Sequence, residues 1–140
     1  MFSSRKKNYN MDIQDLATDE SAELNGKWVP FGPTAKLCVA RAGNQNYLRT
    51  LGRLLDEAGI DLSKNDPDTE ARADGVLVTA LATAVLVGWE GLSFKGVPME
   101  YSVANAKTLL GVREFRRRVE AIASDFNTFR LKAEAAQGNG

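Results

Sequence analysis

The acidic residues between positions 66 and 70 are the first group whose spacing could support chemistry, because carboxylate oxygens are the ligands that calcium prefers. An EF-hand loop that began at Asp66 would need glycine at its sixth position and glutamate at its twelfth. Those positions hold Ala71 and Leu77, so the calcium-binding pattern fails. We expect an exposed segment that leads into a helix, where acidic side chains in the first turn favour the helix dipole.

A second group of carboxylates, near the N-terminus, could perform general acid–base catalysis. The group comprises Asp12, Asp15, Asp19, Glu20 and Glu23. Catalytic carboxylates need a pocket that shifts their pKa values. These residues lie in a polar segment or at the surface, so we expect no such pocket, no catalytic residue and no enzyme activity.

The absence of histidine and the presence of a single cysteine exclude several other chemistries. A zinc site draws on cysteine and histidine ligands, and Ser-His-Asp or Cys-His catalysis requires an imidazole base. One thiol cannot form an intramolecular disulfide, which fits a reducing compartment. Cys38 lies in an apolar run, so we expect a buried structural thiol. The glycines do not form a phosphate-binding loop, and neither a metal nor a cofactor is expected.

Four arginines in the C-terminal third could bind phosphate groups, namely Arg113, Arg116, Arg117 and Arg118. Successive helical residues point about 100° apart, so the last three do not form one stripe. The formal net charge is zero, with 18 basic and 18 acidic side chains. A general nucleic-acid binder usually carries a basic excess on one face. Nucleic acid is therefore not expected as a partner.

The elements that position these residues are expected to form one domain, since 140 residues with 44% hydrophobic content suffice for a single core. Residues 1–20 are polar and without periodicity, which predicts a flexible N-terminal segment. Residues 21–135 are expected to fold as the domain, and residues 136–140 as a flexible tail. Two β-leaning runs predict a hairpin over residues 27–41, with Pro30 on an edge strand because it lacks an N–H.

Two helices are expected in the middle of the chain. Leucines spaced three and four apart predict the first over residues 44–58, with Gly59 as its C-cap. An acidic, exposed linker is expected over residues 60–73. The second helix is expected over residues 74–88 and is apolar on all sides. Such a helix is usually buried, so it needs either full cover by neighbours or a partner surface.

An aromatic elbow over residues 89–101 leads to Ser102, which is expected to cap a short helix that ends before Gly111. The last helix is expected over residues 112–135, which at about 1.5 Å per residue is on the order of 35 Å long. Its apolar stripe consists of Phe115, Val119, Ile122, Phe126 and Phe129. The predicted fold class is therefore mainly α: a small helical domain with an N-terminal β-hairpin and a long C-terminal helix.

Aromatic side chains of the hairpin, the elbow and the last helix are the candidates for partner binding. They are Trp28, Phe31, Trp89, Phe94, Tyr101, Phe115, Phe126 and Phe129. An apolar stripe is more often core than interface, but the predicted last helix is long for a chain of this size. Any part of its stripe that stays exposed would mark a protein-binding groove or a surface for self-association.

No signal peptide is expected, because the first residues are basic and polar and no apolar segment follows. The longest apolar run, residues 76–87, is shorter than the roughly 20 residues that span a bilayer. No membrane association is therefore expected. Met11 is an alternative candidate for the translation start.

Several short motifs resemble those of tail assembly chaperones from long-tailed bacteriophages. In the elbow region they are Trp89-Glu90-Gly91, Gly96-Val97-Pro98, Tyr101-Ser102, Asn105-Ala106 and Leu109-Leu110. Elsewhere they are Lys27-Trp28-Val29 with Phe31, the run from Val39 to Asn44, Tyr47, Glu114-Phe115, Ile122 and Phe126-Asn127. The resemblance covers residues 20–129. Its motifs mark turns and helix ends and contain no catalytic groups.

The resemblance implies a small, mostly helical, non-enzymatic protein that acts during virion assembly. Such chaperones bind the tape measure protein, keep this long helical rod soluble and help to recruit tail tube subunits around it. They act in the host cytoplasm and are absent from the mature virion. In many phages a programmed frameshift also produces a longer form. Client binding by helix-in-groove packing needs no cofactor.

Two alternatives remain open from the sequence. The chain could be a structural neck or tail component that stays in the virion, or a nucleic-acid-associated regulator that uses the arginine cluster. Mass spectrometry of purified virions separates the first alternative from a chaperone. A gel shift with duplex DNA at low salt tests the second.

Overall fold

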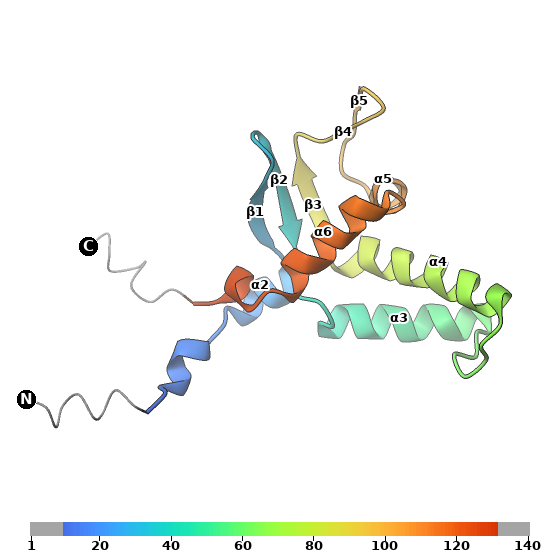
Figure 1. The fold of residues 1–140 in the computed structure, drawn as a ribbon, viewed down its shortest axis with the longest axis horizontal. Helices are drawn as coiled ribbons and strands as arrows, with labels where there is room; N and C mark the ends of the chain where they lie inside the picture. Colours follow the sequence, from blue (N-terminus) through green and yellow to red (C-terminus); the bar gives the residue numbers. More distant parts are fainter. Residues whose placement is uncertain (1–9, 132–140) are drawn as a thin grey trace, which may run out of the picture.

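The computed structural model describes residues 10–131, which form two antiparallel sheets and several helices (Figure 1). The elements in chain order are the 3-10 helix η1 (Ile13–Leu16), α2 (Glu20–Asn25), β1 (Lys27–Phe31), β2 (Ala35–Val39), α3 (Gln45–Ala58), α4 (Pro67–Ala84), β3 (Leu86–Glu90), β4 (Ser93–Phe94), β5 (Val97–Pro98), α5 (Val103–Leu110), α6 (Arg113–Ser124) and α7 (Phe126–Phe129). The tail predicted over residues 136–140 lies outside the described residues.

The larger sheet has three strands in the order β1-β2-β3, all antiparallel. The hairpin predicted over residues 27–41 is confirmed as β1 and β2. Pro30 lies on an edge strand, as expected, where a missing N–H costs least. The register sets Val29 and Trp89 opposite Leu37, so these three side chains share the face that carries the core.

α3 and α4 form a two-helix arm that extends away from the sheet in Figure 1. The bounds predicted for α3 are confirmed to within one residue. The Asn44 side chain accepts a hydrogen bond from the Tyr47 amide at 2.9 Å and caps the helix start. Gly59 ends the helix in the left-handed conformation, with φ of 64°, which glycine adopts without strain.

The bounds predicted for the second helix are wrong, because α4 begins at Pro67 rather than residue 74 and ends at Ala84 rather than residue 88. The Asp66 carboxylate accepts a hydrogen bond from the Thr69 amide at 2.8 Å, and proline suits the first helical position. The second half of the expected linker over residues 60–73 is therefore the first part of α4.

The fold class predicted as mainly α is wrong: the described chain is mixed, with helices and two antiparallel sheets. The residues expected to end the second helix form β3 instead. A helix there would leave one edge of buried β2 without hydrogen-bond partners, which is costly for a backbone. The Ala40 amide donates to the Val85 carbonyl at 2.8 Å and ties the end of α4 to the end of β2.

The expected long C-terminal helix is also wrong, since α6 ends at Ser124 and the short helix α7 follows. Asp125 has ψ of 118° and accepts a hydrogen bond from the Asn127 amide at 2.9 Å. Aspartate competes with the helix backbone and favours such caps. The Thr128 hydroxyl donates to the Ile122 carbonyl at 2.9 Å, which fixes the bend. Phe129 is thereby turned into the interior, where it is 1% exposed.

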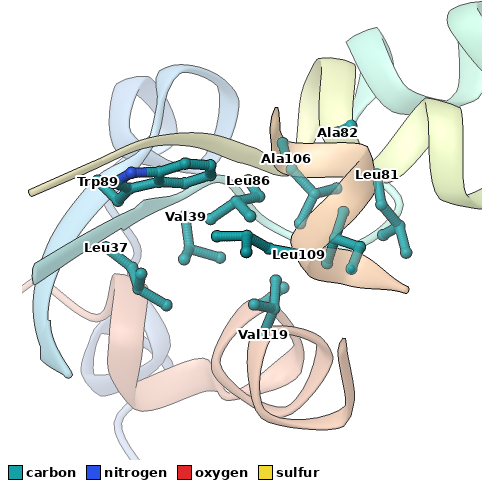
Figure 2. Packing of buried hydrophobic residues seen from close by; sticks show 12 residues of the cluster. Leu37, Val39, Leu81, Ala82, Leu86, Trp89, Ala106, Leu109 and Val119 are labelled. Carbon is teal, nitrogen blue, oxygen red and sulfur yellow. The ribbon is translucent and has the colours of Figure 1, made fainter. Parts of the chain in front are cut away.

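The core lies between one face of the larger sheet and the helices α4, α5 and α6 (Figure 2). The labelled side chains point toward one another: Leu37, Val39, Leu81, Ala82, Leu86, Trp89, Ala106, Leu109 and Val119. Ser102 caps α5 as predicted, because its hydroxyl accepts a hydrogen bond from the Asn105 amide at 2.9 Å. Gly111 then separates α5 from α6, as expected.

The first and last described segments lie together. The Asp19 amide donates to the Phe129 carbonyl at 2.8 Å, and the Leu131 amide donates to the Ala17 carbonyl at 2.9 Å. Residues 1–9 lie outside the described residues, so flexibility of the segment over residues 1–20 stays a prediction. Among the helices of residues 10–131, none has both the length and the apolar composition to cross a membrane.

Candidate protein-binding site

An apolar hollow of about 220 Å³ opens where β1, the β4–β5 hairpin and the junction of α5 with α6 meet. Its lining residues are Phe31, Leu92, Ser93, Phe94, Leu109, Val112 and Phe115. Three of the aromatic residues predicted for partner binding, from segments far apart in the chain, therefore come together here. The hollow is the candidate functional site of this fold.

Phe31 and Phe115 form one wall of the hollow. Strand alternation places Phe31 on the core face of β1, and helical spacing aligns Phe115 with Val119 on the inner face of α6. The two ring centroids are 5.6 Å apart and the ring planes meet at 85°, an edge-to-face contact that fixes both rings. Both side chains are half-buried and pack against the core, so the wall is rigid and still accessible.

The β4–β5 hairpin holds Phe94 over the hollow. Its two turn residues, Lys95 and Gly96, have φ of 53° and 80°, the pattern of a tight turn that matches strand twist. The base of the hairpin is fixed by a hydrogen bond of 2.9 Å from the Met99 amide to the Leu92 carbonyl. The Lys95 ammonium lies 5.4 Å from the centre of the Phe94 ring, close enough for a cation–π contact.

Val112 lies at the junction of α5 and α6 and completes the rim. It occupies the N-cap position of α6 but offers no side-chain hydrogen bond to the first helical amides. Residues with an oxygen on a short side chain are strongly preferred at this position, and their replacement by an aliphatic residue costs about 1 kcal/mol. The valine is 43% exposed, so an apolar side chain faces the hollow where a capping residue would stabilise the helix.

None of the lining side chains carries a charge. The volume lies below the roughly 300–1,000 Å³ of small-molecule pockets. A hollow of this size and composition suits one or two apolar side chains of a protein partner. Its chemistry is therefore binding by burial of apolar surface rather than catalysis.

Trp89 and Tyr101, predicted as partner-binding residues, are used inside the fold. Their rings meet edge to face with centroids 5.0 Å apart. The Trp89 indole N–H donates to the Met99 carbonyl at 2.8 Å. The Tyr101 hydroxyl lies within hydrogen-bond distance of the Leu86 and Ala82 carbonyls, at 3.0 and 3.2 Å. Burial raises the pKa of the Tyr101 phenol.

Trp28, Phe126 and Phe129 lie away from the hollow. Trp28 is 49% exposed and lies across Gly88, on the sheet face opposite the core. Phe129 is buried, with the Arg41 guanidinium 5.7 Å from its ring centre. Phe126 is half-buried, with the Arg130 guanidinium 5.9 Å from its ring centre. The structure does not bring these three residues together with the lining residues.

Four lining residues were not predicted, namely Leu92, Ser93, Leu109 and Val112. Leu109 and Leu92 follow ordinary apolar patterns, so their types give no signal of an open site. Val112 does offer a signal in the sequence, since a helix start without a capping residue is unusual.

Three of the carboxylates considered for chemistry cap helices, and the thiol is buried. Asp12 caps η1, Asp19 caps α2 and Asp66 caps α4. Within residues 10–131, no cluster of three or more acidic, cysteine or histidine side chains could hold a metal ion. Burial raises the pKa of the Cys38 thiol, which opposes the reactive thiolate form.

The arginine cluster is largely matched by carboxylates. Arg116 lies 3.0 Å from Asp74, and both Arg117 and Arg118 contact Glu114, at 2.8 and 3.1 Å. The hydrogen bond from Arg118, together with the charge of Arg117, lowers the pKa of the Glu114 carboxyl. The expectation that nucleic acid is not a partner stays a prediction.

Comparison with known proteins gives a match to a protein family. The model of a family described as YdaY prophage protein matches residues 42–139, a range that runs from the start of α3 through the β4–β5 hairpin, α5 and all of α6. The matched range omits β1 and with it Phe31. No curated protein and no solved structure matches the chain.

Proposed function

The chain belongs to the YdaY prophage protein family, and from this phage origin we propose that it is a tail assembly chaperone. In this role it binds the tape measure protein, keeps it soluble and helps to recruit tail tube subunits during virion assembly. It acts as a non-enzymatic protein in the host cytoplasm, needs no cofactor and is absent from the mature virion. The family match supports the phage context, and the resemblance of the elbow motifs supports the finer role.

The observation that carries the proposal is the uncharged hollow between Phe31, Phe94 and Phe115. A chaperone for a helical rod must cover apolar side chains that would otherwise cause aggregation. A client helix that presents apolar residues at spacings of three and four could insert one of them between these rings. The charged groups nearby, such as Lys95 and Glu114, would keep the complex in solution.

A single hollow of this size gives a weak contact. Burial of one large aliphatic side chain contributes about 2 kcal/mol. This gain is small against the loss of translational and rotational freedom on binding. A client with many repeated apolar side chains would therefore bind several copies of the chain along its length. The small free-energy gain of each hollow therefore favours a long rod over a compact globular partner.

The test is co-expression with the tape measure protein of the same phage, with Val112→Asp as the disrupting variant. The aspartate places a charge in the hollow and also supplies the missing N-cap of α6. We expect the wild-type chain to bring the client into the soluble fraction and the variant to lose this activity. Thermal unfolding should show that the variant is as stable as the wild type, to within about 1 kcal/mol.

Val103→Asp is the matched control. Val103 is 42% exposed, lies at the first position of α5 and does not line the hollow. It therefore receives the same change at a comparable helix start. The proposal is contradicted if the client stays insoluble with the wild-type chain, or if both aspartate variants solubilise it equally well. Detection of the chain in purified virions would favour the structural-component alternative instead.

A further inference from the structure

The charged side chains around the apolar hollow determine which partners suit it. The charged residues that directly precede or follow a lining residue in the chain are Lys95, Arg113, Glu114 and Arg116. Two of these four are paired within the chain. Glu114 contacts Arg117 and Arg118 at 2.8 and 3.1 Å. Arg116 contacts Asp74 at 3.0 Å. The charges of Glu114 and Arg116 are therefore already matched by opposite ones.

The other two residues, Lys95 and Arg113, are positive charges without such a match. Both are exposed, and none of the ion pairs among residues 10–131 involves either of them. The Lys95 ammonium lies 5.4 Å from the ring centre of Phe94, which lines the hollow. Arg113 is the first residue of α6 and directly follows Val112, which also lines the hollow. The hairpin and the helix that form the hollow thus each contribute an unmatched cation.

The start of α6 adds to the positive potential at this edge of the hollow. The N-terminus of a helix carries a partial positive charge on amides that lack an intrahelical partner. No side chain caps these amides in α6, because Val112 offers no acceptor. The acidic side chain of the first turn, Glu114, is itself paired with two arginines. A carboxylate that approached the hollow would therefore meet a favourable potential.

A partner that combines an apolar side chain with nearby carboxylates matches both features of the hollow. Its apolar side chain gains free energy by burial among the uncharged lining residues. In a helix, residues three and four apart lie on one side, so acidic residues that flank an apolar row reach the rim with it. A basic helix with the same apolar row would bring like charges toward Lys95 and Arg113, which opposes binding.

We propose that the hollow binds acidic amphipathic helices, in which aspartate or glutamate flanks the apolar row. The inference rests on the proposed function, because it specifies which segments of a helical client the chain binds. Lys95 and Arg113 then pair with carboxylates of the bound helix. Exposed ion pairs contribute little free energy each, so burial supplies most of the affinity and the two cations supply the preference between segments.

Titration of the full chain with two synthetic peptides tests this preference without any client. Both peptides are helical and of equal length, with leucines spaced three and four apart. Glutamates flank the leucines in one peptide and lysines in the other. Two-dimensional amide NMR follows the binding. We expect the glutamate peptide to shift the amide signals of Phe94, Val112 and Phe115 and to bind about tenfold more tightly than the lysine peptide at low salt. The difference should shrink as salt is added.

Charge reversal assigns the preference to the two cations. A chain with both Lys95→Glu and Arg113→Glu should bind the lysine peptide more tightly than the glutamate peptide. Arg113→Glu alone leaves the contact between Lys95 and Phe94 in place and should reduce the preference, and glutamate in the first turn favours the helix dipole. Lys64→Glu is the matched control, because Lys64 is exposed between α3 and α4 at the far end of the arm (Figure 1). It should keep the wild-type preference.

Four outcomes for the wild-type chain overturn the inference: equal affinity for the two peptides, tighter binding of the lysine peptide, no binding of the glutamate peptide at about 1 mM, or amide shifts confined to other parts of the chain. An unchanged preference in the double variant, or its loss in Lys64→Glu, also overturns it. The co-expression test keeps the two proposals apart. A client that is solubilised without any charge preference refutes only this inference, and binding of the glutamate peptide without solubilisation of the client refutes only the chaperone role.

Discussion

The phenol of Tyr101 shows how one side chain connects three elements of this fold. Its hydroxyl reaches carbonyls at the end of α4 and the start of β3, and its ring packs on Trp89. A hydroxyl in this position fixes the angle between the helix and the strand. The tyrosine was predicted to bind a partner, but its geometry gives it this internal role.

Tyr101→Phe should lower the free energy of unfolding by about 1–2 kcal/mol at neutral pH, because carbonyl groups lose a donor. Burial raises the pKa of the phenol in the folded state above its ordinary value near 10. The folded state therefore holds this proton more tightly, so its contribution is complete below about pH 10 and is lost as pH rises through the folded-state pKa. The gap between wild type and variant should narrow above pH 10. Urea titrations at pH 7 and above pH 10 measure it, and a gap that widens at high pH contradicts this account.

The aromatic residues chosen from the sequence include three that line the hollow. Residue type alone did not show which of the rings stay exposed. Phe31, Phe94 and Phe115 meet at the hollow, whereas Trp89 and Phe129 are buried in the core. Whether an aromatic ring is exposed depends on the packing of distant segments, which a residue type cannot report. Val112 was missed although its lack of a capping oxygen was visible in the sequence.

Two helices with locally determined ends, α3 and α5, were predicted with nearly the observed bounds. Asn44 with Gly59 frames α3, and Ser102 starts α5. The cap of α4 was equally local, but the acidic residues around Asp66 and Pro67 were assigned to a linker. Strand β3 could not be found in the same way. Residues 86–89 continue an apolar pattern that favours a helix, but pairing with β2 makes them a strand.

Asp66→Ala tests the local origin of α4. Loss of the cap should destabilise the helix start by about 1 kcal/mol. Since the first turns of α4 lie at the exposed end of the arm, we expect local fraying rather than global unfolding. Amide hydrogen exchange should speed up at Thr69 and Glu70 while the amides of β2 remain protected. Asp68→Ala, which removes an acidic side chain from the same turn but not the cap, serves as control; faster exchange in both variants would assign the effect to charge alone.

At the scale of the whole molecule, the hollow lies at the junction of the sheet, the β4–β5 hairpin and α6, whereas the arm of α3 and α4 extends away from the sheet (Figure 1). A rod-like client with repeated apolar side chains would engage the hollows of several copies along its length.

The most direct test of the chaperone role is a tagged pull-down from phage-producing cells, read by mass spectrometry, with the wild-type chain and Val112→Asp in parallel. The account predicts that the wild-type chain recovers the tape measure protein, with or without the tail tube subunit, and that Val112→Asp recovers neither. Recovery of neither protein by the wild-type chain, together with its presence in purified particles or on DNA, would contradict the account.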